Sequence, residues 1–423
     1  MTGEWIRRDV REVPGFEGMT ARVVDEIVDA VGHVKGPAAA ARIRNEGVQQ
    51  IHEVIDAREV ARLRDRVLDA LRTPLLEMAV AVGRGVLGWK GDFYVDDYLI
   101  LRVNFPFEVA RGSDRGAENP GVGRLSASVR DLFKARKTID PVYDPKSYHR
   151  SLPPAAWAHG PHCDSWAGHS RDGRNIWWAI GPVPADAGMV LYPELANLDL
   201  PPDPRTLYLK AGVPLPPPTA LPLEAGEMLV FDPEVLHGTH LNTTGETRVA
   251  VSMRLNASRP RFDPGCFYAR EFWRRAADIE AGVDNVLHLP REENLGPPAP
   301  ARPAAAPARL PTAAGVVDPA SGVIRAPLDG TVASAPRVIV EADGHRVMVL
   351  RTPRGLRAYD AACPHYGLDL ADGGMDSTRT YCPGCALAFD LDTGRSACPS
   401  LTLAAHGVRE QDGVMLIETG VSR

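Results

Sequence analysis

Two histidines and one aspartate have the types and spacing of a metal site. His162 and Asp164 are two residues apart, so on a β-strand both side chains would point to the same face. His237, far away in the sequence, offers a third ligand. Two imidazoles and one carboxylate leave open positions on an octahedral Fe(II) ion for a bidentate 2-oxoacid and dioxygen. The pattern predicts an oxidative iron site, although a His-x-Asp pair alone is common by chance.

The residues after His237 carry a family resemblance. They read His-Gly-Thr-His-Leu-Asn-Thr-Thr-Gly-Glu-Thr-Arg as far as Arg248, and this block resembles the distal motif of phytanoyl-CoA dioxygenase-like Fe(II)/2-oxoglutarate oxygenases. The resemblance covers about residues 45 to 260. It implies that His162, Asp164 and His237 bind the iron and that Arg248 pairs with the distal carboxylate of 2-oxoglutarate. A planar guanidinium suits that role because it donates two parallel hydrogen bonds to a carboxylate.

Two nearby residues compete with those that the resemblance selects. His240 follows His237 by three positions and is the alternative metal ligand. Arg254 lies on the same predicted strand as Arg248 and is the alternative partner of the oxoacid. The family pattern favours His237 and Arg248.

Three further side chains are candidate cosubstrate contacts. Trp177 matches a family position near the cosubstrate, although a Trp on a strand is more often part of a core. Arg102 and Asn104 alternate on one face of a strand that lines the cavity in similar proteins. The polar and aromatic residues after Asp164 suggest that the substrate is a polar or ring-bearing small molecule of secondary metabolism.

A second candidate metal site lies near the C-terminus. Cys363-Pro-His365 is followed, after sixteen residues, by Cys382-Pro-Gly-Cys385, and this spacing resembles a Rieske ferredoxin domain over about 100 residues. The family has His where this chain has Cys385. Three Cys and one His suit a 2Fe-2S cluster of lowered potential or a structural zinc ion, and an empty, vestigial site is the remaining alternative. Cys398 is a possible substitute ligand with no spacing in its favour.

The texture of the sequence predicts a mainly β protein in two domains. From about residue 95 to 260, short apolar runs are separated by Pro, Gly and Asp, which indicates a double-stranded β-helix of the jelly-roll or cupin-like kind. We predict this oxygenase domain, with flanking N-terminal helices, at residues 1–293. A Pro- and Ala-rich linker follows at 294–317, and a small all-β Rieske-like domain at 318–423.

Three local patterns predict individual elements of these domains. Asp56 and Glu59 form a capping-box pattern before an amphipathic helix. The loop from Leu200 to Leu221 is rich in Pro and either shapes substrate access or is a passive excursion. In the C-terminal part, Asp343-Gly344 is a turn signal between two apolar runs and predicts a hairpin.

Composition narrows the function classes. With 44% hydrophobic and 24% charged residues and a net charge of -6, the chain has no charge signature of nucleic-acid or membrane binding. We found no signal peptide and no apolar run of the ~18 residues that span a bilayer, which predicts a cytoplasmic protein.

The sequence thus predicts an Fe(II)/2-oxoglutarate-dependent dioxygenase that hydroxylates a small molecule. Its partners would be the substrate and dioxygen, and the electron-transfer domain would either re-reduce ferric iron after uncoupled cycles or dock a ferredoxin reductase. The alternative is a cupin-like binding or regulatory protein with a zinc or redox module.

Overall fold

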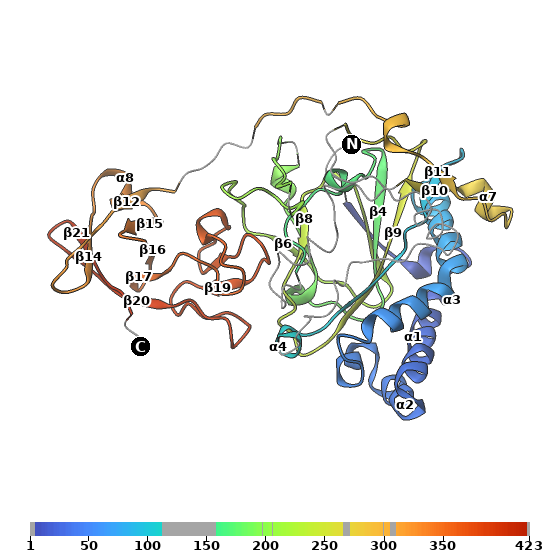
Figure 1. The fold of residues 1–423 in the computed structure, drawn as a ribbon, viewed down its shortest axis with the longest axis horizontal. Helices are drawn as coiled ribbons and strands as arrows, with labels where there is room; N and C mark the ends of the chain where they lie inside the picture. The colour runs from blue at the N-terminus through green and yellow to red at the C-terminus, as the bar shows by residue number, and fades with distance from the viewer. Residues whose placement is uncertain are drawn as a thin grey trace.

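The computed structural model describes residues 5–111, 158–196, 198–204, 206–264, 271–298, 300–304 and 310–420. Within these ranges, two β-rich units stand next to each other in Figure 1. The first has an eight-stranded and a three-stranded sheet, and the second has an eight-stranded and a two-stranded sheet. The predicted mainly β fold class is confirmed.

Helices at the N-terminus cover one side of the first unit (Figure 1). They are α1 (Met19–Lys35), α2 (Pro37–Glu46), the short 3-10 helix η2 (Val48–Glu53) and α3 (Val60–Ala81). The predicted capping box is present, because the Asp56 carboxylate accepts from the Glu59 amide at 3.1 Å while the Asp56 amide donates to the Glu59 carboxylate at 3.0 Å. The predicted apolar face of α3 is buried and packs toward β3.

The large sheet of the first unit has the order β1-β7-β4-β9-β2-β10-β11, with β3 also paired to β9. The small sheet has the order β6-β5-β8. The short apolar runs predicted between about residues 95 and 260 overlap strands of these two sheets. The strands are β1 (Trp5–Asp9), β2 (Tyr94–Asp96), β3 (Ile100–Asn104), β4 (Gly173–Ala179), β5 (Met189–Leu191), β6 (Thr219–Leu221), β7 (Glu227–Phe231), β8 (His237–Thr239), β9 (Arg248–Asn256), β10 (Phe272–Arg275) and β11 (Leu287–His288).

The second unit is also built from β-strands. Its large sheet has the order β12-β15-β16-β17-β20-β21-β14-β13, and β18 pairs with β19. The predicted hairpin is confirmed: β15 and β16 pair in antiparallel fashion across Asp343 and Gly344, whose φ angles are 42° and 82°. The strands are β12 (Thr312–Ala314), β13 (Val316–Val317), β14 (Val323–Pro327), β15 (Arg337–Ala342), β16 (His345–Thr352), β17 (Gly355–Asp360), β18 (Arg379–Tyr381), β19 (Ala388–Asp390), β20 (Ala405–Gln411) and β21 (Val414–Glu418).

The predicted linker makes backbone pairs at both ends. Leu295 pairs with Phe262, and Ala304 pairs with Asp199, so its first part lies along the first unit. Its last residues form β12 and β13 of the second unit. We propose on this basis that the C-terminal domain begins at Thr312. In the described part of the chain, no helix has the length and apolar character needed to cross a membrane.

Candidate metal centres and cosubstrate pocket

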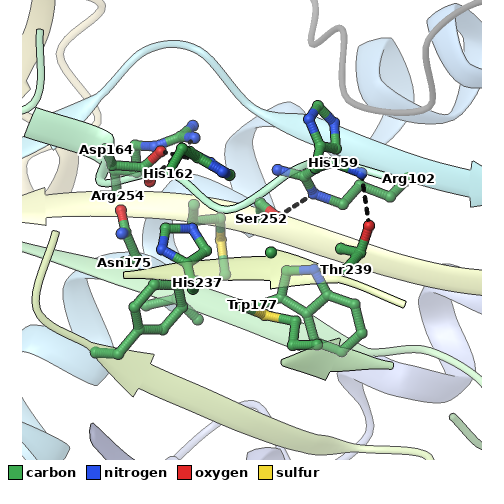
Figure 2. Close-up of a pocket in the computed structure, with 15 residues that line it drawn as sticks. Arg102, His159, His162, Asp164, Asn175, Trp177, His237, Thr239, Ser252 and Arg254 are labelled. Carbon is green, nitrogen blue, oxygen red and sulfur yellow. Dashed lines mark hydrogen bonds and ion pairs between the residues drawn. The ribbon is translucent and has the colours of Figure 1, made fainter. Parts of the chain in front are cut away.

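The structure brings the three predicted iron ligands together. The ligand atoms of His162, Asp164 and His237 all lie within 4.8 Å of one another. Nε2 of His162 is 3.4 Å from Oδ1 of Asp164, and the two imidazole rings have their centroids 4.3 Å apart. Two backbone hydrogen bonds between His162 and His237, of 2.8 and 3.0 Å, fix this spacing. The side chains converge from different segments (Figure 2).

Local backbone geometry at the pair differs from a simple strand. His162 forms an isolated β-bridge with His237, whereas Asp164 is the first residue of a 3-10 turn, η4 (Asp164–Ala167). The Asp164 amide donates to the Pro233 carbonyl at 2.9 Å, which holds the start of this turn against the segment that leads into β8. The turn therefore brings the Asp164 carboxylate toward the histidines. From the sequence, we had expected the alternation of side chains along a strand to do this.

Each histidine is oriented by a backbone carbonyl. Nδ1 of His162 is 2.8 Å from the Gly160 carbonyl oxygen, and Nδ1 of His237 is 2.9 Å from that of Val235. A carbonyl oxygen only accepts, so each Nδ1 carries the proton and each Nε2 has its lone pair free for a metal.

The charge state of the group also suits a metal. Burial would raise the pKa of Asp164, but the charge of Arg254 and other neighbours outweighs it and holds that pKa well below its usual range. Arg254 Nη2 lies 3.7 Å from Asp164 Oδ2. Burial, followed by the proximity of His162, lowers the pKa of His237 to about 3. The site thus offers an anionic carboxylate and a neutral imidazole at neutral pH, which is the donor chemistry that Fe(II) requires.

A pocket opens beside the three ligands (Figure 2). Arg102 and Trp177 line it, as predicted from the sequence, whereas Asn104 and Arg248 are not among its lining residues. Asn104 lies opposite Arg248 in the β3–β9 pair. The Arg248 guanidinium carbon is 6.0 Å from the centre of the Trp177 ring, which is itself part of the wall. Arg248 is therefore one side chain away from the pocket.

Arg248 has the environment of an anion-binding residue. Only 2% of it is exposed, and its Nη1 donates to the Ala187 carbonyl. Among the described residues, its Nε and Nη2 atoms have no hydrogen-bond partner, and the same holds for Nε1 of Trp177. Burial, followed by the charge of Arg102, lowers the pKa of Arg248 to about 9. Buried donors of this kind fit a carboxylate ligand such as that of 2-oxoglutarate.

Several residues of the pocket were missed by the sequence reasoning. They are His159, Asn175, Thr239, Ser252 and Met253, among others. Asn175 and Ser252 had a usable signal, because Asn175 precedes Trp177 by two positions and Ser252 lies four positions after Arg248, so each shares a strand face with a predicted residue. His159 had no such signal, because it belongs to none of the predicted strands.

The two alternatives of the sequence analysis lie elsewhere in the site. His240 does not belong to the group of close ligand atoms found in the described residues, and its Nδ1 lies 2.6 Å from the Leu241 carbonyl oxygen. Arg254 lines the pocket but is paired with Asp164, as described above. It stabilises the anionic carboxylate.

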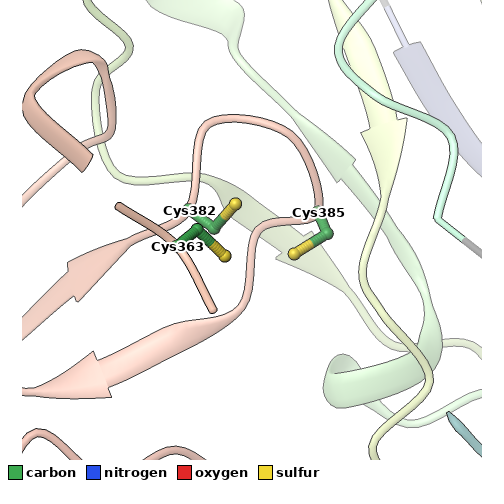
Figure 3. Close-up of side chains that lie close together, drawn as sticks. All are labelled: Cys363, Cys382 and Cys385. Carbon is green, nitrogen blue, oxygen red and sulfur yellow. The ribbon is translucent and has the colours of Figure 1, made fainter. Parts of the chain in front are cut away.

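The C-terminal cysteines form the second candidate metal centre. The thiols of Cys363, Cys382 and Cys385 lie within 4.8 Å of one another and are almost fully buried (Figure 3). Hydrogen bonds from the other two thiols lower the pKa of Cys363 to about 3. His365 is not part of this close group, and its ring centroid lies 5.0 Å from that of Phe107 of the first unit. Three converging thiols fit a metal-sulfur centre.

Cys398, the possible substitute ligand, is engaged elsewhere. Its thiol donates to Oε1 of Glu108 at 3.0 Å. Glu108 lies in the short helix α4 (Phe107–Ala110) of the first unit, so this hydrogen bond crosses between the two units.

Comparison with known families places both units. The profile of the phytanoyl-CoA dioxygenase (PhyH) family matches residues 43–250, and that of the Rieske [2Fe-2S] domain matches residues 328–403. The chain joins a phytanoyl-CoA dioxygenase domain to a Rieske domain. The first implies Fe(II) and 2-oxoglutarate, and the second implies a 2Fe-2S cluster. Both groups fit the donors described above.

Solved structures show similarity to each domain separately. The epimerase SnoN, in complex with Fe3+, alpha-ketoglutarate and nogalamycin RO, is 14% identical over 62% of this chain and 82% of its own, with a TM-score of 0.32. The ferredoxin of carbazole 1,9a-dioxygenase from Nocardioides aromaticivorans is 25% identical over 20% of this chain and 84% of its own, with a TM-score of 0.18. The ferredoxin of Sphingomonas yanoikuyae B1 is 25% identical over 20% of this chain and 85% of its own, with a TM-score of 0.19. No curated protein matches the chain.

Proposed function

We propose that the PhyH domain hydroxylates a small molecule in a reaction that depends on Fe(II) and 2-oxoglutarate. His162, Asp164 and His237 would hold the iron through Nε2 and carboxylate oxygens. The observation that carries the proposal is Arg248, a buried guanidinium with unpartnered donors beside the pocket of the three ligands. A protein that only bound a metal would have no need for it.

Each nearby residue has a part in this reaction. Arg248 would bind the distal carboxylate of 2-oxoglutarate with two parallel hydrogen bonds, and Nε1 of Trp177 would donate a further one. Arg254 would keep Asp164 ionised, and the carbonyls of Gly160 and Val235 would keep both imidazoles oriented. When bound, the ferrous ion and 2-oxoglutarate supply the oxidising chemistry, in which dioxygen is consumed and 2-oxoglutarate becomes succinate and carbon dioxide.

The space for a substrate lies next to the ligand segment. A cavity of about 350 Å³ is lined by Gly160 and Pro161, by Tyr208 of the Pro-rich loop, and by Tyr366 and other residues of the Rieske domain. The ring of Tyr208 has its centroid 6.1 Å from that of His162. This volume suits a small molecule. Of the two roles considered for the loop from Leu200 to Leu221, we therefore propose that it shapes substrate access.

The charged residues around this cavity limit the class of substrate that it can bind. Asp203, Asp369 and Asp372 line it, Lys210 is the one basic residue among the described lining residues, and Arg346 pairs with Asp369 from outside this lining. Such a lining disfavours polyanionic substrates such as acyl-CoA thioesters. We propose a ring-bearing molecule that is neutral or cationic.

The test is an anaerobic titration of the full-length protein with Fe(II) and then 2-oxoglutarate. The proposal expects a weak visible charge-transfer band that saturates with 2-oxoglutarate and is absent from His237→Ala. His240→Ala is the matched control and should retain the band. A protein that binds Fe(II) but develops no band with 2-oxoglutarate would instead be a cupin-like binding protein, which is the alternative reading.

A further inference from the structure

The Rieske domain contacts the PhyH domain through its cysteine loops. The Leu241 amide of the PhyH domain donates to the Cys385 carbonyl at 2.9 Å, and both residues have no exposed surface. The Tyr366 hydroxyl, three residues after Cys363, donates to the Ala158 carbonyl at 3.0 Å. Figure 3 shows the cysteine loop close to ribbons of the PhyH domain. The end of the Rieske domain that would hold the cluster therefore faces the oxygenase.

Further contacts fix this orientation. The ring of His365 stands edge-on to that of Phe107, with 5.0 Å between centroids. Glu108 accepts from the Cys398 thiol at 3.0 Å and from the Ser400 amide at 3.1 Å. On the Pro-rich loop, the Leu215 amide donates to the Asp372 carbonyl at 2.8 Å. The two domains are thus held by several separate hydrogen bonds around the cysteine loops.

The Leu241 contact leads directly to the iron ligands. Leu241 follows His237 by four residues, so the two Cα atoms are separated by at most about 14 Å even in a fully extended chain. A second contact runs beside the first: Ala386, the residue after Cys385, packs in one buried apolar cluster with Leu236, the residue before His237. These two contacts place the loop that carries Cys385 directly against the segment that carries the iron ligand His237.

We infer that the hydrogen bond from Leu241 to Cys385, with the chain back to His237, is an intramolecular electron path that lets the Rieske domain reduce the mononuclear iron. This inference rests on the proposed function. In each event one electron leaves the reduced cluster and converts one ferric ion to ferrous, with no bond made or broken. The ferric ion arises when dioxygen is consumed without substrate oxidation. The cluster is reduced by an external one-electron donor, such as a reduced flavoprotein.

The path can be tested by flash photoreduction of the anaerobic, fully oxidised full-length protein with a deazaflavin. Visible absorbance follows the cluster, and the high-spin ferric EPR signal follows the mononuclear iron. We expect the cluster to be reduced first and then to reoxidise at a rate independent of protein concentration, while the ferric signal falls. A protein loaded with Zn(II) at the iron site should keep its cluster reduced.

Two substitutions to proline separate the path from general docking. Leu241→Pro removes the N–H donor and should slow the transfer at least about tenfold, whereas Leu241→Ala keeps that donor and should transfer normally. Leu215→Pro removes a different interdomain N–H donor, between two existing prolines, and should leave the rate within about twofold.

The outcomes distinguish this inference from the proposed function. A transfer rate that scales with protein concentration, equal rates in Leu241→Pro and wild type, or zinc in place of a cluster would each overturn the path. Where Leu241→Pro does not fold, the concentration dependence of the wild-type rate still decides whether the transfer is intramolecular, which the path requires. The 2-oxoglutarate band, recorded on the same samples, tests the proposed function: its presence without electron transfer removes only the path.

Discussion

Replacing Arg248 with Met should stabilise the ligand-free protein and abolish its response to 2-oxoglutarate. Burial lowers the pKa of Arg248 to about 9, and a shift of this size corresponds to roughly 5 kcal/mol against the folded state. Methionine loses the hydrogen bond to the Ala187 carbonyl and the cation–π contact with the Trp177 ring, at a cost of about 1 kcal/mol each. The net gain should raise the Tm of the PhyH domain by roughly 5 °C or more.

The pH dependence of that gain has a definite sign. A base with a lowered pKa in the folded state destabilises the fold at pH values below that pKa, and the penalty is relieved as the pH rises above about 9. The stability difference between Arg248→Met and wild type should therefore shrink by about 1.4 kcal/mol between pH 8 and pH 10. Differential scanning calorimetry of the ligand-free protein at several pH values measures it.

A second buried arginine provides the control. Arg274 is 5% exposed and donates to Asp97 at 3.1 Å, so Arg274→Met leaves a buried carboxylate less compensated and should lower the Tm. For 2-oxoglutarate, loss of two charge-assisted hydrogen bonds of about 1.5–3 kcal/mol each should weaken binding by a factor of at least about 100 in Arg248→Met. An Arg248→Met protein that is less stable than wild type, yet binds 2-oxoglutarate normally, would refute the reasoning.

Three other predictions concern the cosubstrate, the second metal and the fold. Trp177→Phe removes the Nε1 donor and should raise the KM for 2-oxoglutarate about tenfold with little change in kcat, by steady-state kinetics. Cys382→Ser should lose the iron and acid-labile sulfide of the Rieske domain while the Fe(II)–2-oxoglutarate band persists, by metal and sulfide analysis. Asp56→Ala removes the side-chain hydrogen bonds of the turn before α3 and should lower the free energy of unfolding by about 1 kcal/mol in urea, whereas the exposed Asp25→Ala should lower it far less.

Much of the fold followed from local patterns. The Asp56–Glu59 cap and the turn at Asp343-Gly344 depend on interactions between residues that are neighbours in sequence, so their signals survive without knowledge of the rest of the chain. The β-strands were found as apolar runs, but their order in the sheets was not, because pairing depends on residues far apart. α3 continues to Ala81 through Pro74, and local propensity does not predict this continuation, because an internal proline normally ends a helix.

The candidate site shows the same division. The sequence predicted His162, Asp164 and His237 through a resemblance, and the structure brings them together, but through a turn at Asp164 in place of a strand. The contact of Leu241 with Cys385 joins residues 144 positions apart, and neither carries a sequence signal for the other. Such contacts arise from the tertiary arrangement of whole domains.

The central claim, that the PhyH domain couples Fe(II) to 2-oxoglutarate, is tested most directly by product analysis. The full-length protein is incubated with Fe(II), 2-oxoglutarate and dioxygen without added substrate, and succinate is quantified against oxygen consumed. We expect slow formation of succinate in proportion to oxygen, abolished in His237→Ala and retained in His240→Ala. Oxygen consumption by the iron-loaded protein without succinate, or equal succinate from His237→Ala, would contradict the claim.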